Sequence, residues 1–198
     1  MNRKFGELAV PAYLLTCLLL GGSTQGVWAN AFLRLLGVVL LTWACMSHRR
    51  QAASRSENRL QLTVAFGLAI VALQLIPLPP QIWTGLPGRS AIAEGYELLG
   101  QSLPWLPISL APYETLSASL ALLPPLAILV AMLRLRAYTP AGIAYAIIIA
   151  AVAGILLGVV QLTTLDPATS RSPWYLYRFV NLGTAAGFFA NSNHMATL

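Results

Sequence analysis

Four polar side chains near the end of the sequence could do chemistry at a membrane surface: Arg178, Asn191, Asn193 and His194. Asn191 and His194 are three residues apart and share one helix face, whereas Asn193 faces elsewhere unless the helix begins there. Two amides and an imidazole are costly to bury in lipid, so they should face a helix bundle or a water-filled cleft. The planar fork of an arginine suits an anionic headgroup such as a diphosphate. The pattern predicts a substrate-binding role for these four residues.

The same residues also have a structural interpretation. Asn191 or Ser192 could cap a helix that follows, and the other polar groups could hydrogen-bond between helices. The sequence contains no phosphate-binding glycine loop, metal-ligand cluster or nucleophile–base–acid set. Cys17 and Cys45 lie in apolar runs, where small thiols are expected to pack. We therefore predict no metal and no cofactor, and the catalytic residues stay unknown.

The composition determines which elements must position these side chains. The chain is 57% hydrophobic and only 9% charged, with a mean hydropathy of +0.69. Ordinary soluble domains carry roughly 25% charged residues, so this composition predicts an integral membrane protein. The net charge of +6 comes from basic residues placed between apolar runs. That placement is typical of membrane topology and argues against nucleic acid as a partner.

The apolar runs predict an all-α, polytopic transmembrane helix bundle with five full spans and an incomplete sixth. The expected spans cover residues 5–22, 27–46, 60–76, 115–133 and 140–162. The twelve residues from Gly187 to Leu198 reach only about 18 Å as a helix, against a hydrocarbon core of roughly 30 Å. We therefore expect a truncated sixth span, a chain that is the N-terminal part of a larger protein, and low order after Ala186. A re-entrant or interfacial helix is the alternative.

Arginine and lysine residues set the expected orientation. Eight of the twelve fall in segments assigned to the inner side and three in segments assigned to the outer side. This bias predicts a cytoplasmic N-terminus, with loops 77–114 and 163–186 outside. The remaining one, Arg34, lies inside the second span. It either reaches up to the interface or faces the bundle or an anionic lipid.

Three local patterns refine this picture. A proline pair, Pro124-Pro125, should kink the fourth span. Ala150, Gly154 and Gly158 form a small-residue face, which could pack within the bundle or between two copies. In loop 77–114, apolar residues recur at near-helical spacing and predict a short amphipathic helix at the membrane interface, with positions Ile92, Tyr96, Leu99 and Leu103.

The run Gly187–His194, GFFANSNH, resembles the Gly-x-Phe-x-Asn-x-Asn signature that opens the core domain of the bacterial O-antigen ligase and polymerase family. The segment 75–87, LIPLPPQIWTGLP, together with Pro107-Ile108-Ser109-Leu110, is similar to an outer loop of some such ligases. The resemblance implies an inner-membrane glycosyltransferase with periplasmic loops 77–114 and 163–186. Its members move a glycan from an undecaprenyl-diphosphate carrier to lipid A–core or to another glycan, without nucleotide sugar or metal.

The resemblance also implies roles for the four polar residues. Asn191, Asn193 and His194 match the motif region and would line the donor site. Arg178 would correspond to the arginine found before the motif, although its spacing of nine residues to Gly187 is longer. The catalytic arginines and histidine of the family lie in a later outer loop, so this part alone is expected to be inactive. A transporter or lipid flippase and a non-catalytic scaffold are the alternatives, and neither glycan nor acceptor can be assigned.

Overall fold

The computed structural model describes residues 3–47, 54–135 and 138–198. These residues are mostly helical, and they separate into two compact units. Unit 1 comprises Met1–Arg50 and Leu123–Leu198, and unit 2 comprises Gln51–Leu122. The residues proposed to bind substrate all belong to unit 1.

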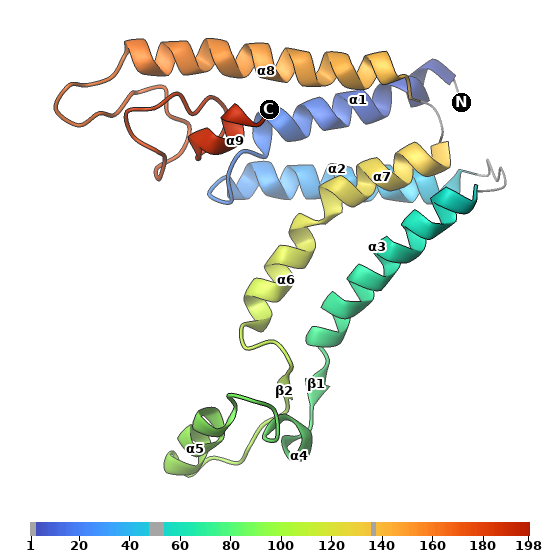
Figure 1. The fold of residues 1–198 in the computed structure, drawn as a ribbon, viewed down its shortest axis with the longest axis vertical. Coiled ribbons are helices and arrows are strands. Elements are labelled where there is room, and N and C mark those ends of the chain that lie inside the picture. The colour runs from blue at the N-terminus through green and yellow to red at the C-terminus, as the bar shows by residue number, and fades with distance from the viewer. Residues whose placement is uncertain (1–2, 48–53, 136–137) are drawn as a thin grey trace. The chain divides into compact units, whose positions relative to one another are not determined.

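Unit 1 is built on four long helices, which Figure 1 shows in two pairs. The first pair is α1 (Arg3–Leu20) with α8 (Pro140–Thr163), and the second is α2 (Val27–Met46) with α7 (Leu123–Leu135). The two helices of each pair run in the same direction, and the pairs run opposite to each other (Figure 1). The start of α8 and the ends of α2 and α7 therefore lie at one end of the unit, opposite the turn that joins α1 to α2.

Small side chains let these helices approach closely. The fully buried positions between α2 and α7 are alanines: Ala44, Ala127 and Ala131. Tyr13 of α1 is also buried, and its hydroxyl donates to a main-chain carbonyl of α2 at 2.8 Å. A Cβ added at Gly37 would lie 2.7 Å from that hydroxyl, so the tyrosine fits because this position is a glycine. Within a lipid bilayer the hydrophobic effect does not drive helices to associate, so close van der Waals packing of this kind holds them together.

The small-residue face of α8 packs within the chain. Ala150, Gly154 and Gly158 are buried, as is Ala146 one turn earlier. A Cβ at Gly158 would come within 3.0–3.1 Å of side chains from the closing segment of the chain. The intramolecular alternative is thus confirmed, and this face is not free to pair with a second copy.

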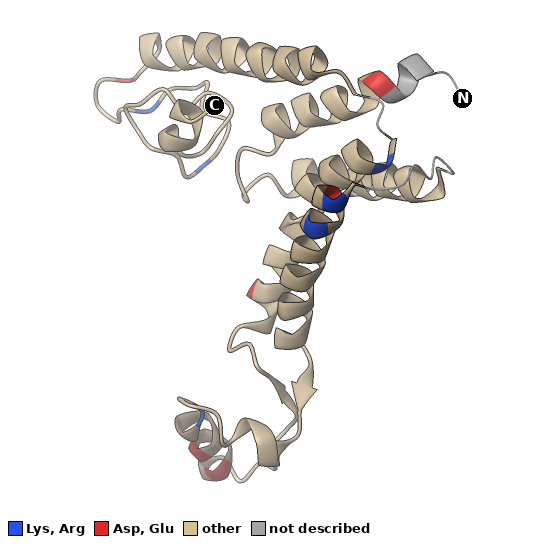
Figure 2. Ribbon diagram, turned by 45° about the vertical axis from the view of Figure 1, so that its right-hand side comes forward, with Lys and Arg blue, Asp and Glu red and all other residues tan. Residues whose placement is uncertain are grey.

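Three helical stretches are long and apolar enough to cross a membrane: Val27–Met46, Pro112–Leu135 and Pro140–Thr163. Figure 2 shows α8 without a charged residue, and several of its large apolar side chains are exposed. The chain is therefore a membrane protein, but the five full spans expected from the sequence are not confirmed. The apolar part of α1, Glu7–Leu20, is shorter than a span. Expected span 60–76 falls in α3 (Arg55–Gln74), whose first turns carry three charged residues, at positions 55, 57 and 59.

The proline pair interrupts the expected fourth span. A single residue, Leu122, separates α6 (Pro112–Ala121) from α7, which begins at Leu123. Pro124 and Pro125 then occupy the first turn of α7, where a missing N–H costs nothing. The proline pair predicted to kink the span thus lies directly after a break in the helix at Leu122.

Unit 2 folds the expected outer loop into a small subdomain. Strand β1 (Pro77–Leu78) pairs antiparallel with β2 (Leu106–Pro107), and the short helices α4 (Pro80–Trp83) and α5 (Ser90–Leu98) lie between them in sequence. Trp83 is fully buried, and its Nε1 donates to the Pro104 carbonyl at 2.8 Å. Arg89 is also buried, and its guanidinium donates to two main-chain carbonyls, those of residues 107 and 108.

The amphipathic helix expected in this loop corresponds to α5. Its Ile92 and Tyr96 are half-buried within unit 2, whereas Leu99 just after the helix is 72% exposed. The four predicted positions therefore do not form one exposed apolar face. The helix is confirmed, and its placement at the membrane interface stays a prediction.

Candidate functional site

The residues after α8 form a loop that folds back along that helix and ends in the short helix α9 (Ser192–Ala196). Gly187 packs against Gly154, which lies nine residues before the end of α8 at Thr163. At 1.5 Å per residue, the loop returns about 14 Å along the helix. Figure 1 shows this segment beside the half of α8 that extends past α1 and α2.

Gln161 supports the segment from inside the bundle. Its side chain is fully buried, and its Oε1 accepts hydrogen bonds from the main-chain N–H groups of Ala186 and Gly187 at 3.0 and 2.8 Å. Its Nε2 donates to the carbonyls of Gly187 and Trp174 at 3.0 and 3.2 Å. Gly187 has a φ of +57°, and a Cβ there would lie 3.0 Å from the Gly154 carbonyl oxygen. Both conformation and space require glycine at the start of the motif.

The turn between α1 and α2 supports the segment from the other side. The N–H of Ala190 donates to the carbonyl of Gly22 at 3.1 Å. The side-chain amide of Gln25 both accepts from the N–H of Phe179, at 2.9 Å, and donates to its carbonyl, at 2.7 Å. A Cβ at Gly22 would lie 1.9 Å from the carbonyl oxygen of Phe188. The motif therefore fits against this turn only because Gly22 has no side chain.

Two further side chains order the loop itself. The hydroxyl of Tyr175 donates to the carbonyl of Thr184 at 2.8 Å and accepts from its N–H at 3.2 Å. The Asp166 carboxylate accepts from the N–H of Ala168 at 2.8 Å and from the hydroxyl of Thr169 at 3.0 Å. These hydrogen bonds, that of Ala168 first, lower the pKa of Asp166 below its ordinary value. Ala186 and Gly187, at the start of the motif, are buried. The expectation of low order after Ala186 stays a prediction.

The motif polar residues divide into a structural one and two exposed ones. The side-chain oxygen of Asn191 accepts from the N–H of Asn193 at 2.9 Å, so Asn191 is the N-cap of α9. The capping alternative is thus confirmed for Asn191. Asn193 and His194 are exposed on α9, and the His194 ring meets Phe189 edge-on with centroids 6.3 Å apart. Asn193 faces outward because the helix begins just before it.

Arg178 lies on the same loop but is not joined to the other three predicted residues. Its guanidinium is exposed and lies 5.5 Å from the ring centroid of its neighbour Phe179. Within the described part of the chain, no ion pair or hydrogen bond engages that guanidinium. A second exposed arginine, Arg171, donates to two main-chain carbonyls, those of residues 177 and 178. The loop that precedes the motif therefore carries an unpaired positive charge.

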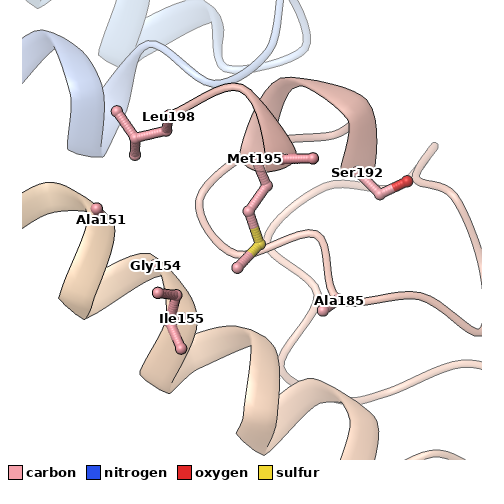
Figure 3. Close-up of a pocket in the computed structure, with 8 residues that line it drawn as sticks. Ala151, Gly154, Ile155, Ala185, Ser192, Met195 and Leu198 are labelled. Atoms are coloured by element: carbon pink, nitrogen blue, oxygen red, sulfur yellow. The ribbon is translucent and has the colours of Figure 1, made fainter.

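An apolar groove of about 430 Å³ separates α9 from α8. In Figure 3 the Met195 side chain points toward Gly154, and the Ser192 hydroxyl points away from α8. Apart from Ser192, the lining is apolar: Ala151, Gly154, Ile155, Ala185, Met195, Ala196 and Leu198. The helix thus presents polar groups to solvent and apolar groups to the groove.

Sequence reasoning missed Gln161, Gln25 and Gly22. The sequence offered only weak indications of two of them. Gln161 is a polar residue in an otherwise apolar helix, and Gly22 belongs to a pair of glycines that follows the first helix. Among residues 3–47, 54–135 and 138–198, no group of three or more His, Cys, Asp or Glu side chains is arranged to hold a metal. The chain matches no protein-family model, and it has no significant match among curated proteins or solved structures.

Proposed function

We propose that this chain forms the donor-side part of an O-antigen ligase-like glycosyltransferase in a bacterial inner membrane. It would present a glycan on an undecaprenyl-diphosphate carrier for transfer to lipid A–core or to a growing polysaccharide. The observation that carries the proposal is the firmly supported motif segment, which presents Asn193 and His194 to solvent and follows a loop that carries the exposed Arg178. The motif resemblance supplies the reaction class, since no matched protein does.

The proposed site suits both parts of such a donor. The unpaired guanidinium of Arg178 would bind a diphosphate oxygen, and Asn193 and His194 would donate hydrogen bonds to the diphosphate or the first sugar. Asn191 would act indirectly, by capping α9. The apolar groove beside α9 would contact hydrocarbon, either of the carrier or of the surrounding lipid. The groups that perform the transfer are not assigned to residues of this chain.

The proposal includes five crossings with a cytoplasmic N-terminus. Helices α2 and α7 run in the same direction, so a chain that spans with both must cross back once between them (Figure 1). The apolar part of α3, from Leu60 to Gln74, is the described segment that fits this crossing. α1 would be the shortest crossing, and loop 163–186 would face the periplasm. Arg34 is half-buried in α2, near the same outer face.

The test is glycan transfer in cells that depend on this protein. We expect His194→Ala and Asn193→Ala to reduce transfer at normal protein levels, whereas Gln101→Ala, an exposed change in unit 2, should leave it unchanged. Normal transfer by the His194 variant would refute the proposal and favour a scaffold. Movement of the lipid-linked glycan across the membrane without any transfer would instead favour the flippase alternative.

A further inference from the structure

We infer that Gln161 is the positioning residue that fixes the motif segment, and with it the exposed edge of α9, against α8. The placement of the segment is independent of the proposed function. Only the substrate-binding role of the exposed edge of α9 rests on it. The inference concerns a side chain with no exposure to solvent, which makes all its hydrogen bonds to the folded-back loop. In the part of the chain that the structure describes, its hydrogen-bond partners are Trp174, Ala186 and Gly187, which all lie outside the helices.

The geometry explains why this residue is a glutamine. One side-chain oxygen accepts two N–H groups, and one side-chain nitrogen donates to two carbonyls. A leucine of similar size would remove the partner of all four main-chain groups, three of which are in buried contacts. A glutamate could still accept but could not donate while ionised, and an asparagine would be one methylene too short to reach.

The location explains why the contact controls placement. The loop's main chain leaves regular structure beside an apolar helix, where an unpaired N–H or carbonyl costs about 1–3 kcal/mol. Gln161 satisfies these groups at Ala186 and Gly187, directly before the motif residues. Its third partner, the carbonyl of Trp174, lies in the first arm of the loop, the part that leaves α8, whereas Ala186 and Gly187 lie in the second arm, the part that returns. One side chain therefore ties both arms of the loop to α8.

The experiment follows the burial of residue 186 in the full chain reconstituted in phosphatidylcholine nanodiscs. Ala186→Cys is introduced with Cys17→Ala and Cys45→Ala, and its reaction rate with a water-soluble maleimide is measured. Ala186 has no exposure, so the reporter reacts slowly while the segment is held. We expect Gln161→Leu to raise this rate at least about tenfold. The matched change Gln101→Leu, at an exposed site, should leave it unchanged.

A pH profile separates positioning from general damage. The three residues bonded to Gln161 have no titratable side chains, so a Gln161→Glu variant adds one new titrating group. Near pH 5 its neutral carboxyl both donates and accepts, and the reporter should react as slowly as in the Gln161 protein at that pH. Near pH 9 the carboxylate repels the two carbonyls, and the reporter should react several-fold faster than in the Gln161 protein.

Two results would overturn the inference: a Gln161→Leu rate equal to that of the Gln161 protein, or a Gln161→Glu rate ratio that does not change with pH. The proposed function fails separately. If reporter rates change as expected but His194→Ala leaves glycan transfer in cells unchanged, the placement stands and the assigned reaction does not.

Discussion

The contact between the α1–α2 turn and the motif provides a sharp test, because a single methyl group should break it. Gly22 does not adopt a positive φ, so alanine is compatible with its backbone conformation. The effect of Gly22→Ala is therefore a matter of space. The new Cβ would lie 1.9 Å from the carbonyl oxygen of Phe188 and 2.9 Å from the Cα of Phe189. Both are main-chain atoms, so the motif segment itself must move away from the turn.

The expected cost combines two terms. Overpacking of a tight contact costs about 1–3 kcal/mol. The displaced segment also loses the hydrogen bond from the Ala190 N–H to the Gly22 carbonyl, worth about 1 kcal/mol. Together these lower the free energy of local opening by about 2–4 kcal/mol, which corresponds to a roughly 30- to 1000-fold increase in the opening equilibrium.

Amide hydrogen exchange measures this opening directly. In detergent or nanodiscs, the Ala190 N–H of the Gly22→Ala variant should exchange faster by that factor, up to the limit of the protection it has. Gly67→Ala is the matched control, since Gly67 lies in α3 with nothing within 4 Å of an added Cβ. That change should leave Ala190 unaffected and stabilise α3 by about 0.5–1 kcal/mol. Exchange at Ala190 within threefold of the unmodified protein would refute the assigned contact.

Two smaller predictions concern the same loop. Asn191→Ala should destabilise α9 by about 1 kcal/mol and speed exchange of the Asn193 amide, whereas Asn191→Asp should not; equal exchange in both variants would contradict the cap. Because the pKa of Asp166 is lowered in the folded loop, its carboxylate stabilises the loop above the ordinary pKa, and this contribution disappears as pH falls through the folded value. In the Asp166→Asn variant, the exchange rate of the Ala168 amide should lose this acid dependence. A pH profile equal to that of the unmodified protein would contradict the prediction.

Sequence periodicity was sufficient for the helices. The apolar runs predicted α2 and α8 almost to the residue, because a long uninterrupted apolar stretch has one stable form in lipid. The capping role of Asn191 was one of two open alternatives, since an asparagine before a short helix can either cap it or face a ligand. The predicted spans at α1 and α3 are not confirmed, because charged residues within their first turns shorten the apolar window.

Contacts between distant parts of the chain could not be predicted from the sequence. Gln161 and Gly187 are 26 residues apart, and Gln25 and Phe179 are 154 apart. A lone glutamine in an apolar helix has many possible partners, and hydrophobic patterning does not choose among them. The folded subdomain of unit 2 was missed for the same reason, since it depends on a buried arginine, Arg89, that bonds to the main chain.

The distribution of glycines shows how the motif segment packs so closely against the rest of unit 1. Gly22, Gly154, Gly158 and Gly187 come from four places in the sequence, yet each lies within close contact of the motif segment or belongs to it. Three of them contribute only the absence of a side chain, a requirement that leaves no distinctive pattern around them. The motif residues themselves must supply a cap, a turn and two exposed polar groups within eight positions, so their types are far more restricted. The close packing of this segment therefore depends partly on glycines far from it in the sequence, which the segment alone does not reveal.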